Sequence, residues 1–234
     1  MIRLDKYLSD ASPYSRKEIR NLVKRKSITV NGDIAKVPDM KVDETRDIVA
    51  VNGETVAYRK FIYLMMNKPQ GYLSATEDNR DPVVVDLLPE ELKHFAPFPV
   101  GRLDKDTEGL LLLTNDGQFD HELMSPVKNL FKRYYAELDL PAVQEDIEVF
   151  AAGMEFKEFT AKPARLEIDP ADPRKVCIEI AEGKFHQVKR MCERVGKKVL
   201  FLKRIAIGEL RLDESLECGK TRELTPAELA LFGR

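Results

Sequence analysis

The 234-residue sequence predicts a chain of mixed helices and strands, divided into a small N-terminal module and a larger, β-rich part. The module is indicated by helically spaced apolar residues near the N-terminus, followed by two short strand-like segments that end in Asn-Gly. After Tyr58-Arg59-Lys60 the segments become longer and richer in strand patterns. We therefore expect two domains, residues 1–59 and 60–234, which is a normal division for a chain of this length.

The first helix is indicated by Leu4, Tyr7, Leu8 and Ala11, which follow the i, i+3, i+4, i+7 spacing of one helix face. Pro13 ends this helix because proline cannot continue it.

A second helix follows at once. Ser15 and Glu18 have the spacing of a capping box, and Ile19, Leu22 and Val23 form an apolar stripe. The opposite side is basic and carries Arg16, Lys17, Arg20, Lys24, Arg25 and Lys26. This basic face fits either a solvated helix surface or a surface that binds RNA phosphates.

Two short strands complete the module. Residues 27–30 and 47–51 read as strands, and each is followed by Asn-Gly, the dipeptide best suited to a type I′ hairpin turn. In the second part the sequence predicts strands over 61–66, 110–113, 134–140 and 176–180, a turn over 67–72, and helices over 119–124, 186–195 and 226–232.

A charge-dense loop, residues 101–109, lies directly before the four leucines Leu110–Leu113. Successive leucines point to opposite sides of a sheet, so this run predicts a short strand buried on both faces. Such a strand would hold Asp104 at its rim, where substrate could reach the carboxylate. The alternative is a solvated, charged turn.

Several classes of site are not supported by the sequence. The three cysteines, Cys177, Cys192 and Cys218, are odd in number and lack C-x-x-C spacing, so we expect reduced thiols and no zinc site. The three histidines, His94, His121 and His186, are scattered along the chain. No phosphate-binding glycine loop or G-x-S-x-G elbow occurs. The chemistry should need only carboxylate, phenol and cationic groups, and no metal.

The balance of 38 basic and 40 acidic residues means that affinity for nucleic acid must come from local patches. Neither a signal peptide nor a membrane-spanning apolar run is present in the sequence, so we expect a cytoplasmic protein with no membrane partner.

Four segments occur in the order found in one enzyme family. They are Asn67-Lys68-Pro69-Gln70-Gly71-Tyr72, the 101–109 loop with the leucines, Lys132-Arg133-Tyr134, and residues 182–191, which read EGKFHQVKRM. Together they resemble the motifs of RNA pseudouridine synthases of the RsuA type, and residues 1–59 resemble the alpha-L RNA-binding module shared with a small-subunit ribosomal protein.

This resemblance implies an α+β protein: a small alpha-L RNA-binding domain, and a catalytic domain built on a mixed, largely antiparallel sheet with flanking helices. It also implies a cofactor-free isomerisation of a uridine to pseudouridine, by cleavage of the glycosidic bond, rotation of the base and formation of a carbon–carbon bond. The expected partner is ribosomal RNA, namely 16S rRNA, free or in an assembling small subunit, with uridine 516 as the position implied. We expect the protein to act as a monomer.

The resemblance also assigns roles to individual residues. Asp104 would be the essential carboxylate, acting as nucleophile or as base; Tyr134 would take the proton from carbon 5 of the base; and Lys189, with Arg190 as the neighbouring alternative, would pair with Asp104. Arg102 would enter the stack vacated by the flipped uridine, unless it only pairs with a nearby acid. The basic face of the second helix, with Arg16, Lys17, Arg20, Lys24 and Arg25, would bind RNA phosphates.

Three alternatives remain at this stage. The enzyme could act on 23S rRNA instead, or the chain could be a non-catalytic RNA-binding factor in ribosome assembly. A carboxylate-dependent glycosidase would need a second acid, for which Asp106 and Glu108 are the nearest candidates.

Overall fold

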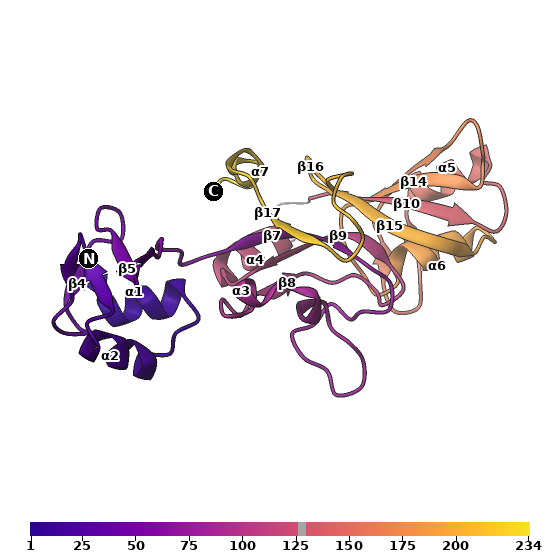
Figure 1. The fold of residues 1–234 in the computed structure, drawn as a ribbon. Helices are drawn as coiled ribbons and strands as arrows, with labels where there is room; N and C mark the ends of the chain where they lie inside the picture. The colour runs from indigo at the N-terminus through magenta and orange to yellow at the C-terminus, as the bar shows by residue number, and fades with distance from the viewer. Residues whose placement is uncertain (126–129) are drawn as a thin grey trace. The chain divides into compact units, whose positions relative to one another are not determined.

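A computed structural model describes residues 1–125 and 130–234 and divides into two compact units (Figure 1). The small unit consists of Met1–Ile62 with Pro89–Ala96, and the large unit of Tyr63–Leu88 with Pro97–Arg234. None of the helices in these described ranges combines the length and apolar character needed to cross a membrane.

The small unit packs helices α1 and α2 against short strands and also includes α3. Four strands form an antiparallel sheet in the order β3-β2-β5-β6, and β1 pairs with β4. The elements are α1 (Leu4–Ala11), α2 (Arg16–Lys24), α3 (Glu90–Lys93), β1 (Ile2–Arg3), β2 (Ile28–Val30), β3 (Asp33–Ile34), β4 (Lys41–Val42), β5 (Val49–Val51) and β6 (Glu54–Thr55). One apolar core, which includes Leu4, Leu8 and Ile19, joins α1 and α2 to the sheet.

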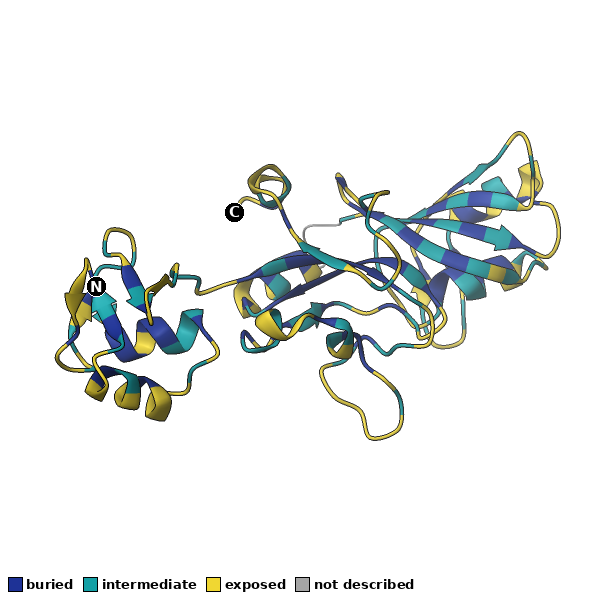
Figure 2. Cartoon of the chain, viewed as in Figure 1, coloured by how far each residue is buried: buried dark blue, intermediate teal, exposed yellow. Residues whose placement is uncertain are grey.

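Helix α2 begins as the sequence predicts. Ser15 Oγ accepts a hydrogen bond from the Glu18 amide at 3.3 Å, and the Glu18 carboxylate accepts one from the Ser15 amide at 2.8 Å, which completes the capping box. Ile19 and Val23 are buried, and the outer face of the helix is exposed (Figure 2). That face carries Arg16, Lys17, Arg20, Lys24 and Arg25.

Both Asn-Gly pairs form the predicted hairpin turns. Asn31 and Gly32 have φ values of 53° and 88°, and Asn52 and Gly53 have values of 51° and 88°. Positive φ at both central residues is what a type I′ turn requires. The turns connect β2 to β3 and β5 to β6, so the local sequence sets the register of this sheet.

The large unit is built on a nine-stranded sheet with the main order β13-β14-β10-β15-β9-β7-β17. Its pairings are antiparallel except that of β15 with β9, which is parallel. Its strands are β7 (Tyr63–Lys68), β8 (Phe98–Val100), β9 (Glu108–Thr114), β10 (Lys132–Leu138), β13 (Arg165–Ile168), β14 (Lys175–Ile180), β15 (Val199–Ile207), β16 (Leu210–Arg211) and β17 (Thr221–Glu223). Two further strands, β11 (Met154–Glu155) and β12 (Thr160–Ala161), pair with each other in a separate hairpin. The helices are the 3₁₀ helix η1 (Val84–Leu87), α4 (Gly117–Met124), α5 (Gln144–Ala152), α6 (Gln187–Arg194) and α7 (Pro226–Ala230). The α+β class with a mixed, largely antiparallel sheet is therefore confirmed.

The four leucines form the buried centre of this sheet. Each residue of Leu110–Leu113 is at most 1% exposed, as expected for a strand covered on both faces. Leu110 and Leu112 pack with Phe119 and Leu123 of α4 on one face. The intervening leucines point to the other face because side chains alternate along a strand.

Some boundaries differ from the sequence prediction. The strand expected over 61–66 runs from Tyr63 to Lys68, because Asn67 and Lys68 pair with Leu110 and Gly109 of β9 and so belong to the sheet and not to the turn. The last helix ends at Ala230 and not at Phe232. The sequence analysis missed α5 and the long central strand β15. The sequence also predicts that Ser125-Pro126 ends the helix over 119–124, and Pro126 lies outside the described residues.

Gly109 allows two strands to approach closely. It has a φ of +102°, and a Cβ atom at this position would lie 2.2 Å from the Arg204 carbonyl oxygen. Real atoms do not come this close, and a side chain rarely adopts this φ. Glycine is therefore required where β9 begins its parallel pairing with β15.

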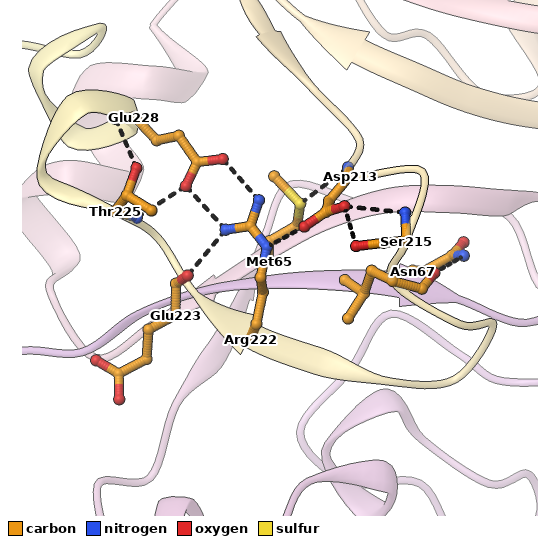
Figure 3. A network of polar contacts seen from close by, with 9 residues as sticks. Met65, Asn67, Asp213, Ser215, Arg222, Glu223, Thr225 and Glu228 are labelled. Atoms are coloured by element: carbon orange, nitrogen blue, oxygen red, sulfur yellow. Dashed lines mark hydrogen bonds and ion pairs between the residues drawn. The ribbon is translucent and has the colours of Figure 1, made fainter.

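Arg222 links the C-terminal helix to the sheet and to a neighbouring loop (Figure 3). Arg222 of β17 donates two hydrogen bonds to the Glu228 carboxylate, at 2.7 and 2.8 Å, and one to Asp213 at 2.7 Å. The hydrogen bonds from Arg222 lower the pKa of Glu228 to about 2, although its partial burial opposes this shift. Helix α7 is thereby held against the loop that contains Asp213.

Candidate active site

The loop between β8 and β9 carries Arg102 and Asp104, and its backbone is held from the inside. Ser74 Oγ donates to the Leu103 carbonyl at 2.9 Å and accepts from the Leu103 amide at 3.0 Å. The amide and the carbonyl of Leu103 are thus both satisfied by one buried hydroxyl. This fixes the residue directly before Asp104 in place.

Lys68 lies beneath the same loop and is fully buried. Its Nζ donates to the carbonyl oxygens of Thr107 at 2.9 Å, Pro69 at 3.0 Å and Asp104 at 3.1 Å, with Lys105 at 3.4 Å. Burial lowers the pKa of Lys68 to about 8, and the nearby loop carboxylates oppose the shift only in part. The ammonium group therefore ties three points of the loop to the turn after β7, at an electrostatic cost.

Asp104 is partnered by Lys189 of α6. Lys189 Nζ lies 3.3 Å from Asp104 Oδ2 and 2.5 Å from Asp106 Oδ1, so one cation serves two carboxylates of the loop. His186 Nε2 lies 3.7 Å from Asp104 Oδ1. The Asp104 side chain is 29% exposed and that of Lys189 is 17% exposed, so solvent reaches the carboxylate more readily than its partner.

Burial by itself would raise the pKa of Asp106, but the hydrogen bond and charge of Lys189 outweigh burial and leave this pKa below its usual value. Asp106 is therefore ionised at neutral pH and shares Lys189 with Asp104.

Arg190, the alternative partner considered for Asp104, is engaged elsewhere. Its guanidinium lies 2.5 Å from Glu158 and stands over the rings of Phe156 and Phe159, at 5.4 and 5.1 Å from their centroids. Of the two adjacent cations, Lys189 is the one that the helix directs to Asp104.

Tyr134 lies on β10, an inner strand of the sheet, and lines the same site as Asp104. A cavity of about 60 Å³ is lined by Asp104, Tyr134 and Lys189, together with residues of the 183–188 segment. The structure thus brings together the three residues that the sequence analysis selected as catalytic candidates. A β-bulge at Ile205 accompanies this placement, since Arg133 pairs with Ala206 while Tyr134 pairs with Arg204.

Two further cations lie near Tyr134 and were not selected from the sequence. Arg204 is buried opposite Tyr134, donates to the Leu110 carbonyl at 2.8 Å, and has one terminal nitrogen without a hydrogen-bond partner. Burial, and then the charge of Arg204, lower the pKa of Lys132, which lies two residues before Tyr134 on the same strand face. Tyr134 therefore has one cation on the paired strand β15 and one on its own strand.

A larger cleft of about 860 Å³ adjoins this small cavity. Both are lined by Arg102, Asp104 and His186, and the larger one extends along Gln70 and Phe185. Arg102 is exposed, and within the described residues it forms no ion pair with Asp106 or Glu108, so the salt-bridge interpretation of Arg102 is not supported. A volume of this size accommodates more than one nucleotide-sized group.

Lys68, Lys132, His186 and Arg204 are the site residues that sequence reasoning missed. Lys68, Lys132 and His186 stand inside quoted motifs, which could have marked them, whereas no motif contains Arg204 and nothing local shows that it is buried. Among residues 1–125 and 130–234, no group of three or more His, Cys, Asp or Glu side chains is placed to hold a metal ion.

Comparison with known proteins agrees with this geometry. The sequence model of a family described as RNA pseudouridylate synthase matches residues 62–194, and that of the S4 domain matches residues 2–49. The chain is 49% identical over 234 residues to an uncharacterised RNA pseudouridine synthase, YtzG, of Bacillus subtilis, with 99% of this chain and 98% of that protein covered.

Two further relatives extend the comparison. The chain is 40% identical to the ribosomal small subunit pseudouridine synthase A of Vibrio parahaemolyticus, with 97% of this chain and 98% of that protein covered. A crystal structure described as that of a pseudouridylate synthase superimposes with a TM-score of 0.69 and 34% identity, covering 99% of this chain and all of the other. The chain therefore belongs to the RNA pseudouridine synthases and carries an S4 domain at its N-terminal end.

Proposed function

We propose that this protein converts a uridine of 16S rRNA to pseudouridine, with uridine 516 as the first candidate position. The observation that carries the proposal is the single small cavity lined by Asp104, Tyr134 and Lys189. Relatives at 36–40% identity are named ribosomal small subunit pseudouridine synthase A, which favours the small-subunit RNA over 23S rRNA.

Asp104 starts the reaction at the sugar. A carboxylate can attack C1′ to form a glycosyl ester, or it can remove a proton from the sugar. In either route the bond between C1′ and N1 of uracil breaks, and the detached base keeps the electron pair of that bond. Lys189 Nζ lies 3.3 Å from Asp104 Oδ2, so a positive charge stands beside the carboxylate in both routes.

Tyr134 completes the reaction at the base. The uracil rotates inside the site and carbon 5 bonds to C1′. In the nucleophilic route the ester bond between C1′ and Asp104 breaks at this step, and in the base route Asp104 returns its proton to the unsaturated sugar. Tyr134 takes the proton that carbon 5 loses, and N1 gains a proton, so the product is an isomer of the substrate. Arg204, which is paired with Tyr134 in the sheet, and Lys132, on the same strand face, are the cations that can stabilise charge in this proton transfer.

RNA binding is divided between the two units. The exposed basic face of α2 binds phosphates, and its contribution falls as salt rises. Arg102, exposed at the mouth of the cavity, stacks into the space left by the flipped uridine, whose extrusion costs a few kcal/mol.

The glycosidase alternative is disfavoured by the protonation state of Asp106, its candidate second acid. A general acid must carry a proton at neutral pH, whereas the pKa of Asp106 lies below its usual value because the interaction with Lys189 outweighs its burial. The remaining alternatives, a 23S rRNA enzyme and a non-catalytic assembly factor, are separated by one experiment.

That experiment measures tritium release from carbon 5 of uracil in 16S transcript, 23S transcript and partly assembled small subunits. Wild type should release tritium from the 16S substrates. Asp104→Asn should abolish the release while RNA affinity is retained. The control is Asp120→Asn, which changes a carboxylate of α4 that lines neither cavity and should match wild type. Release from the 23S transcript alone would identify 23S rRNA as the substrate. No release from any of the three, with RNA still bound, would establish the non-catalytic alternative.

A further inference from the structure

Phe185 presents an open aromatic face beside the catalytic carboxylate. It is 74% exposed, and one face of its ring stacks on His186 with centroids 3.8 Å apart and planes inclined by 18°. His186 Nε2 in turn lies 3.7 Å from Asp104 Oδ1. Two short contacts therefore link the Phe185 ring to the Asp104 carboxylate, while the outer face of the ring is left to solvent.

The support behind this ring is fixed by an uncommon backbone conformation. His186 has a φ of 51°, in the left-handed region, and directly precedes α6. A residue other than glycine is held there only when its surroundings over-determine the position. The adjacent Gln187 provides part of this constraint, because its side chain accepts from the Lys184 amide at 2.9 Å and donates to Glu182 at 3.1 Å. The short segment that carries Phe185 and His186 is thus pre-organised.

Phe185 also lies where two cavities meet. It lines the cleft of about 860 Å³ that contains Asp104, and it lines a second cavity of about 670 Å³ on the side of α6. The second cavity is bordered by Lys184 and Arg190, whose charges are partly balanced by Glu158 and Glu193. An aromatic face with cations at its edge matches a nucleotide, whose base stacks and whose phosphate is anionic.

We propose that the outer face of Phe185 stacks on the base of a nucleotide adjacent to the target uridine, with Lys184 close to the phosphate between them. This inference rests on the proposed function, because it takes the uridine to occupy the cavity of Asp104. The uridine must leave its stack to react, so its neighbour loses a stacking partner. Phe185 replaces that partner and, since every base has an aromatic face, does so for any base.

The absence of tryptophan from the sequence allows a direct test. In Phe185→Trp a single indole occupies the proposed stacking position, and its fluorescence should be quenched when 16S transcript binds. Phe131→Trp is the matched control, because Phe131 is also exposed, at 51%, but lines a different cavity that contains Arg133 and Tyr135. Heparin, an anion without bases, controls for the effect of charge alone.

Quenching of Phe185→Trp by RNA and not by heparin, with little change in Phe131→Trp, would support the stacking position. Equal quenching by heparin, or unchanged fluorescence while filter binding shows that RNA is bound, would overturn it. Fluorescence quenching needs no turnover. It therefore tests the stacking position of Phe185 even if wild type releases no tritium and the proposed function fails.

Kinetics provide a second readout. Phe185→Ala should raise KM for 16S transcript roughly tenfold, the loss expected for one base stack, and leave kcat nearly unchanged because the stacked base does not react. Phe185→Tyr should stay close to wild type, since the ring is kept. A normal KM in Phe185→Ala, together with normal tritium release, would show that the synthase proposal holds and that the stacking proposal does not.

Discussion

Lys189 Nζ lies 3.3 Å from Asp104 Oδ2 although the same nitrogen is only 2.5 Å from Asp106 Oδ1. The catalytic candidate thus has a partner that a second carboxylate of the same loop also binds and holds in position. Lys189 therefore pairs with both carboxylates, and its shorter contact is the one to Asp106.

Lys189 should be replaceable by another cation but not by a neutral residue. Lys189→Met is expected to lower kcat about 100-fold, the typical loss when one pre-organised electrostatic partner is removed. Lys189→Arg should retain most activity because the charge is kept, with some loss from the different shape of the guanidinium. Single-turnover tritium release checks both variants. Equal kcat values for Lys189→Met and Lys189→Arg would contradict an electrostatic role.

Lys68 should make stability depend on pH in the alkaline range. Burial lowers its pKa to about 8 in the folded protein, whereas an unfolded lysine titrates near 10.5. Between these values the unfolded state binds more protons, so the free energy of unfolding contributed by this group rises with pH. Below pH 8 both states are protonated, and the cost of burying the charge is fully present.

Lys68→Met removes this dependence and leaves the loop carbonyls without their shared donor. The variant should be less stable than wild type by roughly 2–4 kcal/mol, and the difference should widen from pH 8 to 10.5. Urea unfolding of both proteins at a series of pH values measures this difference in the free energy of unfolding. A constant difference across that range would show that Lys68 does not titrate as expected.

Gly109 should tolerate no side chain. In Gly109→Ala the new Cβ would meet the Arg204 carbonyl oxygen and the residue would be held at an unfavourable φ, so we expect a loss of about 3 kcal/mol or more. Gly117→Ala is the matched control, because its Cβ would have open space at the start of α4, and it should be neutral or slightly stabilising. Urea midpoints compare the two. Similar midpoints would disprove the close approach of β9 and β15.

The basic face of α2 should supply salt-dependent RNA affinity. Arg20→Glu is expected to weaken binding of 16S transcript and to reduce the slope of log affinity against log salt by about one phosphate contact. Arg46→Glu reverses an equally exposed charge of the same unit outside α2 and should have a smaller effect. Filter binding at several salt concentrations distinguishes the two variants. An identical response would place the RNA-binding surface elsewhere on the S4 domain.

The sequence by itself determined the features whose causes are local. The capping box of Ser15 and Glu18 fixes the start of α2, the Asn-Gly pairs fix two hairpins, and four successive leucines fix a doubly buried strand. Each depends on residues within a few positions of one another, so spacing alone is sufficient. The motif resemblance added Asp104, Tyr134 and Lys189, which the structure places around one cavity.

Only the tertiary structure decided what lies beneath and around those residues. Lys68 is read as part of a turn until the pairing of β7 with β9 buries it under the loop, and β15, unrecognised in the sequence, brings Arg204 beside Tyr134. The choice of Lys189 over Arg190 depends on which cation faces the loop when α6 packs. These relationships join segments that are distant in the chain, and no local pattern records them because they arise only when the sheet assembles.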